Sequence, residues 1–353
     1  MAETKTAFHS NLLVSSSPHY VTKLDTRRTM QYVCIALLPP CVMAVFYFGL
    51  NALIRIILGP VFCFACEYVY DRLLKKKDTT KDCSCFVTGI ILALNLPATL
   101  PIWQEFIGCL VAIVIVKCLY GGIGKNIANP AIVGRIVLFL SFSSNMSTWP
   151  LTRLQKAGVD SVTGATALGE LADGADTLPS LLSLFIGNVG GAMGETCAIA
   201  ILIGAAFLIW KKIISPIIPC VYVATVFIFA LIYYAVVGGA GQYGPLGMAV
   251  FHVLAGGLLF GAVFCATDYV TSPIMNSGKV IYAIGLGICT MVIRLFGSYP
   301  EGVSFAILFM NILTPLIDRY TERQFYGIAK KEKEAKKAAK SGSSDDKKEG
   351  GKA

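Results

Sequence analysis

The sequence predicts an all-α polytopic membrane protein with about ten transmembrane helices, and three observations support this fold class. The chain has 353 residues, of which 55% are hydrophobic and 14% are charged, and its mean hydropathy is +0.67. This composition excludes an ordinary soluble enzyme. Apolar runs of about 17–25 residues, long enough to cross a bilayer as helices, recur along the chain. Basic residues gather beside these runs, as they do beside membrane spans.

The apolar runs differ in length and continuity. The expected spans are residues 30–50, 52–74, 84–98, 102–120, 130–143, 180–210, 216–238, 247–267, 279–296 and 301–318. The third and fifth are short, and the sixth is interrupted between Gly187 and Glu195. Short or interrupted segments often line a site within the membrane instead of facing lipid.

The basic residues predict the orientation. With about ten spans, the basic clusters all fall on one side of the membrane, which the positive-inside rule identifies as the cytoplasm. These clusters are Arg27 and Arg28, Lys75 to Lys77, Lys125, Lys211 and Lys212, and Arg319 with Arg323. The net charge of +9 therefore reports membrane orientation and contact with lipid, and no nucleic acid partner is expected.

The expected number of spans divides the chain into five segments. Residues 1–29 are expected to form a cytoplasmic segment, and they lack the apolar core of a cleavable signal peptide. Residues 30–143 form a first five-helix repeat, residues 144–179 an extracytoplasmic loop, and residues 180–320 a second five-helix repeat. Residues 321–353 form a basic cytoplasmic tail. The protein is thus expected in the cytoplasmic (inner) membrane, with both termini inside the cell.

A weak internal repeat relates the two helical parts. The stretch Thr88–Val137 can be laid over Val263–Leu308, and an odd number of spans separates the copies, so they have opposite topology. Inverted repeats place equivalent breaks on opposite membrane faces and predict two polar clusters. The outer cluster comprises Asn95, Pro97, Tyr299, Glu301 and Gly302, and the inner cluster comprises Gly122, Asn126, Asn129, Asp268 and Ser272. The alternative is ordinary glycine and proline punctuation, with Asn129 as a helix N-cap before Pro130.

A polar loop between the helical parts carries the most specific motif. Residues 160–166 read Asp-Ser-Val-Thr-Gly-Ala-Thr, which resembles the site where a flavin transferase joins FMN, through its phosphate, to the last threonine hydroxyl. Gly164 frees the backbone, Ala165 adds little bulk, and Asp160 and Thr163 are suited to order the turn. We expect Thr166 to be flexible and uncluttered and to carry FMN. The alternative is an ordinary loop that matches by chance.

Two further motifs make a family resemblance specific. Residues 121–131 read Gly-Gly-Ile-Gly-Lys-Asn-Ile-Ala-Asn-Pro-Ala, and residues 266–268 read Ala-Thr-Asp, with Ser272-Pro273 after them. Over roughly residues 20–320 the chain resembles the D subunits of the Rnf complex, the ion-translocating ferredoxin:NAD oxidoreductase of bacterial membranes. It is similar also to the B subunit of the sodium-translocating NADH:quinone reductase, whose N-terminal region is typically longer.

This resemblance implies an inverted 5+5 repeat with a urea-transporter-like fold, and FMN on Thr166. It also implies electron transfer within a complex of about six subunits that moves Na⁺ or H⁺ and includes a second FMN-bearing subunit. A flavin transferase is implied for maturation. The chain has neither a Rossmann nor a P-loop fingerprint, so NAD and ferredoxin are expected to meet other subunits, and this chain is not expected to be catalytic alone.

The quinone-reductase relative also binds a non-covalent flavin, riboflavin, near the cytoplasmic end of its fifth span. The Gly-x-Asn-x-x-Asn-Pro-Ala pattern found there appears here at Gly124 to Ala131, so Asn126 and Asn129 inherit that role by resemblance. An amide both donates and accepts hydrogen bonds, which suits the edge of an isoalloxazine ring. We expect riboflavin inside, near these residues and Asp268, and the covalent FMN outside, near Asn95 and the turn at residues 299–302.

Other features leave alternatives open. A solute channel or transporter would fit an inverted repeat, but it has no reason to carry the motif at residues 160–166. Cys63-x-x-Cys66 and Cys83-x-Cys85 fit either metal ligands or buried small hydrophobes.

Ionisable residues within the expected spans are costly and often functional. We expect Lys117, Arg135 and Arg294 to reach an interface by snorkelling. Glu67 and Asp268 could each contact a sodium ion or a proton, but pairing with a backbone group or with a neighbouring subunit is the favoured expectation.

Overall fold

A computed structural model describes residues 25–75, 79–156, 163–175, 177–238, 242–297 and 301–321, and these residues are mostly helical. Five helices are long and apolar enough to cross a membrane, and a pair of helices bent by 58° gives a sixth candidate. Three further apolar helices are shorter. The protein is therefore a helical membrane protein with several spans, while the expected number of about ten stays a prediction.

The first helical part runs from α1 to α5. Its elements are α1 (Thr26–Phe48), α2 (Leu50–Leu73), the 3₁₀ turn η1 (Thr80–Asp82), α3 (Ser84–Leu94), α4 (Ile102–Leu110), its π-helical continuation η2 (Val111–Cys118), and α5 (Pro130–Ser141). The short α3 and α5 coincide with the short third and fifth apolar runs. Asn129 and Pro130 begin α5 in the way expected of an N-cap and a first helical residue.

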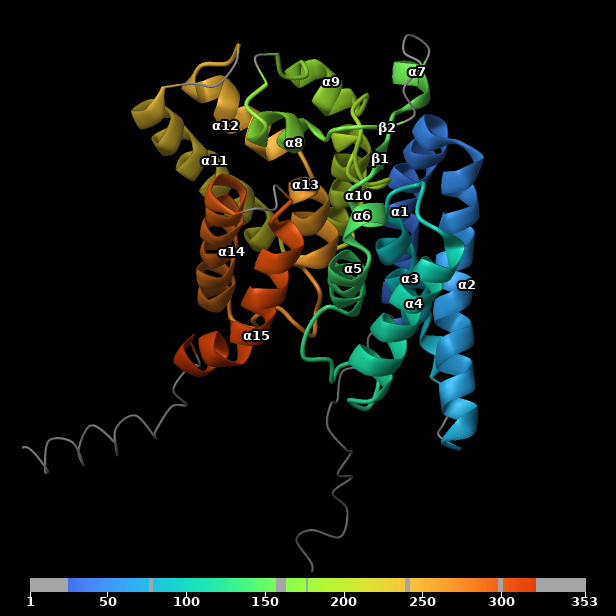
Figure 1. The fold of residues 1–353 in the computed structure, drawn as a ribbon. Coiled ribbons are helices and arrows are strands. Elements are labelled where there is room, and N and C mark those ends of the chain that lie inside the picture. The colour runs from blue at the N-terminus through green and yellow to red at the C-terminus, as the bar shows by residue number, and fades with distance from the viewer. Residues whose placement is uncertain are drawn as a thin grey trace, which may run out of the picture.

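Short elements cover one end of the helices (Figure 1). They are α6 (Ser143–Met146), β1 (Trp149–Pro150), α7 (Arg153–Lys156), β2 (Thr163–Gly164), α8 (Ala167–Ala172) and α9 (Leu181–Ile186). The two strands are antiparallel, with Trp149 opposite Gly164 and Pro150 opposite Thr163. We call this end of the molecule the outer-loop end.

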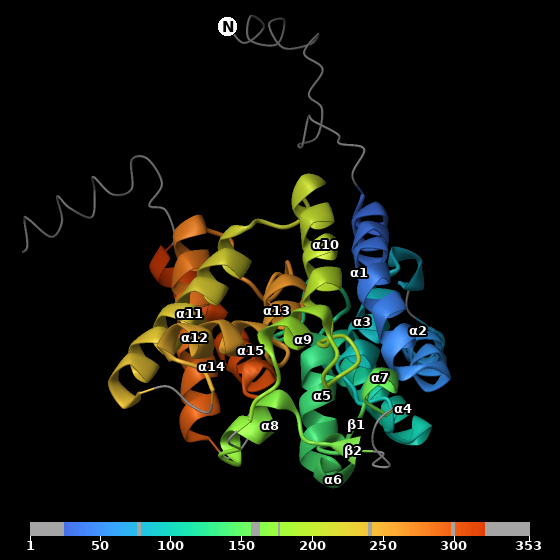
Figure 2. The same cartoon turned by 90° about the horizontal axis from the view of Figure 1, so that it is seen from above.

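The second helical part runs from α10 to α15. Its elements are α10 (Ala198–Trp210), α11 (Ile217–Val237), α12 (Pro245–Leu254), α13 (Leu258–Phe260), its π-helical continuation η3 (Gly261–Cys265), α14 (Asn276–Phe296) and α15 (Val303–Thr321). The helical parts meet where α1 contacts α10 and where α5 contacts α15, and Figures 1 and 2 show the two parts on opposite sides of these contacts.

Buried arginines bind backbone carbonyls that the helix breaks leave free. Arg55 on α2 donates to the carbonyl of Ala98, after α3, at 3.1 Å, and its ion pair with Glu105 of α4 measures 3.2 Å. Arg294 on α14 donates to the carbonyls of His252 and Ala255, at the bend between α12 and α13, at 2.6 and 3.0 Å. An unpaired carbonyl at membrane depth is costly, so these contacts stabilise the broken spans.

The expectation that Lys117, Arg135 and Arg294 snorkel to an interface is wrong. Their exposed fractions are 3%, 6% and 8%, and each side chain is bonded to protein groups. Buried carboxylates and carbonyls, brought close by folding, take the place of the aqueous interface.

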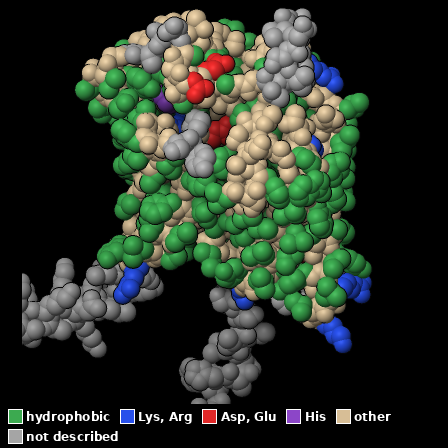
Figure 3. Space-filling model, in the orientation of Figure 1, with side chains coloured by type: hydrophobic (Ala, Val, Ile, Leu, Met, Phe, Trp, Pro, Cys, Tyr) green, Lys and Arg blue, Asp and Glu red, His purple; other side chains and the backbone are tan. Residues whose placement is uncertain are grey.

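Exposed basic residues mark the end opposite the outer loop. They lie where α1 begins and where α2, α10 and α15 end, and are Arg27, Arg28, Lys75, Lys211, Lys212 and Arg319. Figure 3 shows lysine and arginine at this lower end, acidic and some basic side chains at the outer-loop end, where Arg153 of α7 is exposed, and hydrophobic side chains over the flank between the two ends. We call this lower end the basic end. Its expected position in the cytoplasm stays a prediction.

Candidate functional site

Thr166 lies at the outer-loop end and caps α8. Its Oγ1 accepts a hydrogen bond from the backbone N–H of Gly169 at 3.1 Å, and the residue is 7% exposed. Thr166 is therefore neither exposed nor unstructured, contrary to expectation, because its oxygen satisfies an amide that the first turn of a helix leaves free. This bond uses a lone pair of the oxygen and leaves the hydroxyl hydrogen unused, so a bond to phosphorus would not require loss of the cap.

The other motif residues have different surroundings. A Cβ at Gly164 would come within 2.8 Å of the Leu151 side chain, so close packing, and not an unusual backbone conformation, favours glycine there. Ala165 is exposed. Thr163 contributes its backbone to β2. Asp160 lies outside the described residues, so the expected ordering of the turn by these two side chains stays a prediction.

A small pocket adjoins Thr166. Its volume is about 30 Å³, and its lining includes Glu195, Thr196, Gly256 and Glu301. This volume suits a water or two and is too small for a flavin ring. A ring attached to Thr166 would therefore have to lie outside the pocket.

Arg135 of α5 joins this pocket to the predicted outer cluster. Its Nη1 donates to Oδ1 of Asn95 at 3.1 Å and to Oε1 of Glu195 at 3.0 Å, and its Nη2 donates to Oε2 of Glu301 at 2.8 Å. Asn95 and Glu301 are thus brought together by an arginine that was expected at an interface. Glu195 was not among the predicted site residues, although its place at the end of the interrupted sixth run was a signal.

The other described residues of the predicted outer cluster offer little surface that a flavin could contact. Pro97 and Gly302 are buried, and Tyr299 lies outside the described residues. Asn95 is 2% exposed and donates its amide to the carbonyl of Ile91 at 2.8 Å. Its side chain therefore supports the Arg135 network and presents little surface to a flavin.

Three of the five residues expected in the inner cluster line one cavity of about 350 Å³. They are Asn126, Asn129 and Asp268, and Gly124 of the same motif also lines the cavity. Most of the remaining wall is apolar, and its members include Val33, Val87, Ile91, Ile213, Val263 and Phe264. The volume lies at the lower end of the range for small-molecule sites, about 300–1,000 Å³. Gly122 and Ser272 do not line the cavity, although Ser272 donates its N–H to the carbonyl of Asp268 at 3.1 Å.

The two asparagines of the cavity differ. Oδ1 of Asn129 accepts from the N–H groups of Ala131 and Ile132 at 3.0 and 3.5 Å, and its Nδ2 donates to the carbonyl of Cys265 at 3.1 Å. Asn129 therefore caps α5 and ties it to η3. By contrast, Oδ1 of Asn126 is buried without a hydrogen-bond partner among the described residues. Buried acceptors without partners are rare, so Asn126 is the amide available to a ligand.

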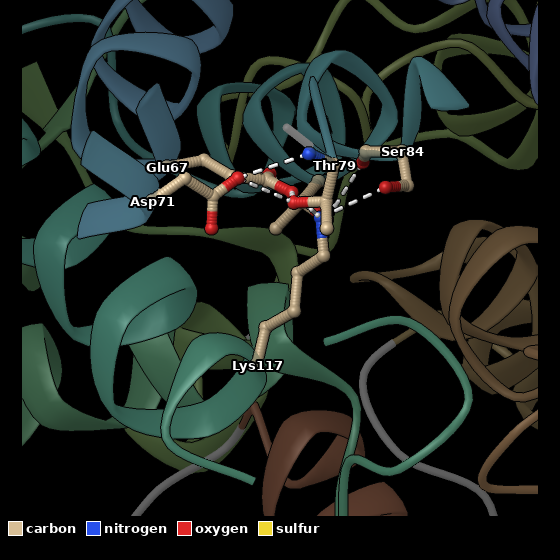
Figure 4. A network of polar contacts seen from close by, with 6 residues as sticks. Glu67, Asp71, Thr79, Ser84 and Lys117 are labelled. Carbon is tan, nitrogen blue, oxygen red and sulfur yellow. Dashed lines mark hydrogen bonds and ion pairs between the residues drawn. The ribbon is translucent and has the colours of Figure 1, made fainter. Parts of the chain in front are cut away.

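A chain of polar contacts runs from the cavity wall (Figure 4). Nζ of Lys117 donates to both oxygens of Glu67 at 2.8 and 2.7 Å, and to Oγ of Ser84 at 2.8 Å. Oγ1 of Thr79 lies 2.6 Å from Oε1 of Glu67 and 2.9 Å from Oδ2 of Asp71. Glu67 therefore pairs with a lysine of the same chain, and not with a backbone group or a neighbouring subunit as expected.

The cysteines show no metal centre in the described part of the chain. Cys63, Cys66 and Cys85 are buried, and Cys83 is partly exposed. No group of three or more His, Cys, Asp or Glu residues within the described ranges is arranged to hold a metal ion.

Comparison with known proteins gives one family. The family model described as "NQR2, RnfD, RnfE family" matches residues 13–327. The D subunit of the Na(+)-translocating ferredoxin:NAD(+) oxidoreductase complex of Acetobacterium woodii is 45% identical over 332 residues, covering 92% of this chain and 98% of that protein. The D subunit of the proton-translocating ferredoxin:NAD(+) oxidoreductase complex of Clostridium ljungdahlii is 41% identical over 323 residues, covering 89% and 96%. The D subunit of the ion-translocating oxidoreductase complex of Stutzerimonas stutzeri is 39% identical over 334 residues, covering 85% and 92%.

Proposed function

The chain belongs to the NQR2, RnfD, RnfE family, and we propose that it is a membrane flavoprotein subunit that relays electrons within an ion-translocating ferredoxin:NAD⁺ oxidoreductase complex. Near full-length similarity to proteins named as the D subunits of such complexes supports this role. Those two relatives are named for different ions, so the proposal covers either Na⁺ or H⁺ as the coupling ion. Ferredoxin and NAD⁺ would bind to other subunits.

The observation that carries the proposal is Thr166, the last residue of the acceptor motif. Its oxygen accepts one hydrogen bond and keeps a replaceable hydrogen, which fits a phosphoester to FMN. The chemistry that a bound flavin supplies is electron transfer. Thr166 would anchor the group, Arg135 would hold Glu195 and Glu301 beside the anchor, and the small pocket would leave the ring outside, where a partner subunit can reach it.

The inner cavity fits a second, non-covalent flavin, which we propose to be riboflavin. Asn126 offers a buried acceptor that no described residue satisfies, and a ligand N–H would satisfy it. The apolar wall would exclude water from the bound group. Asp268 would contribute from the opposite helical part of the chain, while Asn129 would keep the start of α5 in place.

The proposed membrane arrangement follows from the same family. We place the two helical parts as an inverted, urea-transporter-like repeat, with both termini in the cytoplasm and Thr166 on the outer face. Most of the exposed basic residues that the structure describes lie at one end of the molecule, with Arg153 an exception at the outer-loop end, and this bias supports the orientation.

Mass spectrometry of the peptide that contains Thr166 tests the covalent flavin. In protein purified from a host with an active flavin transferase, we expect this peptide to carry the added mass of FMN. Thr166→Ala should lose the added mass, and Thr148→Ala, which removes an exposed hydroxyl of the same loop, should keep it. An unmodified wild-type peptide would refute the proposal.

A further inference from the structure

We propose that Asp71, Thr79, Glu67, Lys117 and Ser84, taken in this order, form a proton path that leads from the basic end of the molecule to the inner cavity. The inference rests on the proposed function in one respect, since the cavity is taken to hold a redox group that becomes basic when it gains electrons. The path itself consists entirely of side chains of this protein.

The contacts are continuous from one end to the other (Figure 4). Lys117 and Ser84 line the cavity, and the ammonium group of Lys117 donates to Glu67 and to Ser84. Thr79 bridges Glu67 and Asp71 at distances of 2.6 and 2.9 Å. Thr79 is only partly buried and lies between α2 and η1, so water at the basic end can reach this end of the path.

With both carboxylates ionised, the single hydroxyl hydrogen of Thr79 would have to serve two acceptors. The Thr79 hydroxyl has a single hydrogen, yet its oxygen lies within hydrogen-bond distance of an oxygen of Glu67 and of Asp71. With both groups ionised, Thr79 would bond one of them only, or share its hydrogen between the two in a weaker three-centre bond, and two like charges would face each other across one hydroxyl. A proton on Asp71 removes the conflict, because Asp71 then donates to Thr79 and Thr79 donates to Glu67.

The charges of the surrounding groups agree with this placement. In this cluster, α2 contributes two carboxylates and η2 contributes the ammonium of Lys117. The net charge is therefore −1, and one added proton makes the cluster neutral. Cys85 of α3 is close enough to interact electrostatically with Glu67 and Lys117. The elements packed against the cluster carry other charged residues, which are Arg27 and Arg28 of α1, Arg55 and Arg72 of α2, Lys81 and Asp82 of η1, Glu105 of α4 and Arg135 of α5. Arg55 pairs with Glu105, and Arg135 pairs with Glu195 and Glu301.

The transfer balances without any co-reactant. Asp71 passes its proton to Oγ1 of Thr79 as the Thr79 hydrogen moves to Glu67. Glu67 passes that proton to Nζ of Lys117 as Lys117 gives a proton to Oγ of Ser84, and Ser84 gives its own hydrogen to a basic acceptor in the cavity. Water at the basic end then protonates Asp71 again, so the net change is one proton moved and no electron.

A purely structural ion pair would not need all of these groups. Lys117 and Glu67 already form an ion pair, and Asp71 adds a second buried carboxylate with its own desolvation cost, offset by the N–H and the hydroxyl of Thr79. Asp71 is 6% exposed and contacts the cluster through Thr79. A second acid joined to the pair by one hydroxyl is an arrangement that can hold and pass a proton.

Infrared difference spectroscopy of the purified complex tests the stored proton without reference to any flavin. The wild type and Thr79→Ser should show the C=O stretch of a protonated carboxylic acid at neutral pH, with the shift expected on exchange into D₂O. Asp71→Asn, which is nearly isosteric, should lose this band. A wild-type spectrum without the band, or an unchanged band in Asp71→Asn, would overturn the proposal.

Proton uptake tests the path itself. Electrochemical reduction of the complex in the presence of a pH-indicator dye should give uptake that Thr79→Val slows by roughly tenfold or more, while Thr79→Ser keeps the wild-type rate. Equal rates in Thr79→Val and the wild type would refute the path. Failure of the proposed function would instead appear as absence of riboflavin from the extracted complex, and the carboxylic acid band would still decide whether the cluster holds a proton.

Discussion

Asn126 and Asn129 lie three positions apart in the same cavity wall but differ in their hydrogen bonding. Asn129 is fully engaged by α5 and by the carbonyl of Cys265, whereas Asn126 keeps an unpartnered buried oxygen. We expect Asn126→Ala to deplete riboflavin from the purified complex with little loss of stability. We expect Asn129→Ala to lower the free energy of unfolding by about 1 kcal/mol, the usual cost of a lost N-cap.

Solvent extraction followed by chromatography measures the riboflavin, and the Tm of the detergent-solubilised protein measures the stability. Retention of FMN on Thr166 in both variants serves as the control for folding and membrane insertion. An Asn126→Ala protein with the wild-type riboflavin content would show that the unpartnered oxygen binds no flavin.

For single residues, the sequence predicts which positions belong to a site but not which distant residues they contact. The motif that ends at Thr166 and the Asn-Pro-Ala pattern are local, so they were visible directly. The partners of Arg135 are not local, because Glu195 and Glu301 lie 60 and 166 residues along the chain. An arginine near a span end was therefore expected to snorkel, and only the fold shows the two carboxylates facing it.

Among the elements, α2 and α3 pack with almost no space between their backbones. A Cβ at Gly89 of α3 would lie 2.5 Å from Cα of Pro60 on α2, and small residues permit such close approach between membrane helices. We expect Gly89→Ala to lower the Tm clearly and to reduce the yield of folded protein, because a backbone atom cannot move aside as a flexible side chain can.

Gly244→Ala is the comparison for this substitution. No atom lies within 4 Å of a Cβ placed at Gly244, which is the exposed N-cap of α12, so its effect should be limited to the loss of a favourable N-cap residue, about 1 kcal/mol or less. Equal Tm values for the two variants would show that the helices can separate at little cost.

The helical elements were predictable where hydropathy alone decides them. The apolar runs locate α1, α2, α11, α14 and α15, and the short third and fifth runs correspond to α3 and α5. The π-helical segments η2 and η3 were not predicted, because they depend on packing between helices and not on composition. The interruption from Gly187 to Glu195 was visible as a break, but its contact with Arg135 was not.

In the molecule as a whole, the two helical parts are joined at several places. α1 lies against α10 and α5 against α15, and Arg135 bonds Asn95 of its own part as well as Glu195 and Glu301 beyond the outer loop. Segments between helices in both parts also line the inner cavity. Asn126 comes from the first helical part and Asp268 from the second. The candidate sites therefore depend on the correct assembly of both parts.

Cysteine labelling in intact cells tests the orientation of the whole molecule. Asp173, after α8 at the outer-loop end, and Lys211, after α10 at the basic end, are both exposed. Because basic residues are retained on the cytoplasmic side, we expect Asp173→Cys to react with a membrane-impermeant thiol reagent in intact cells. Lys211→Cys should react only after the cells are permeabilised. The wild type, which has an exposed cysteine at position 220, sets the background of the measurement. The reverse labelling pattern would place Thr166 in the cytoplasm, and the proposed orientation would then be wrong even if the covalent flavin were found.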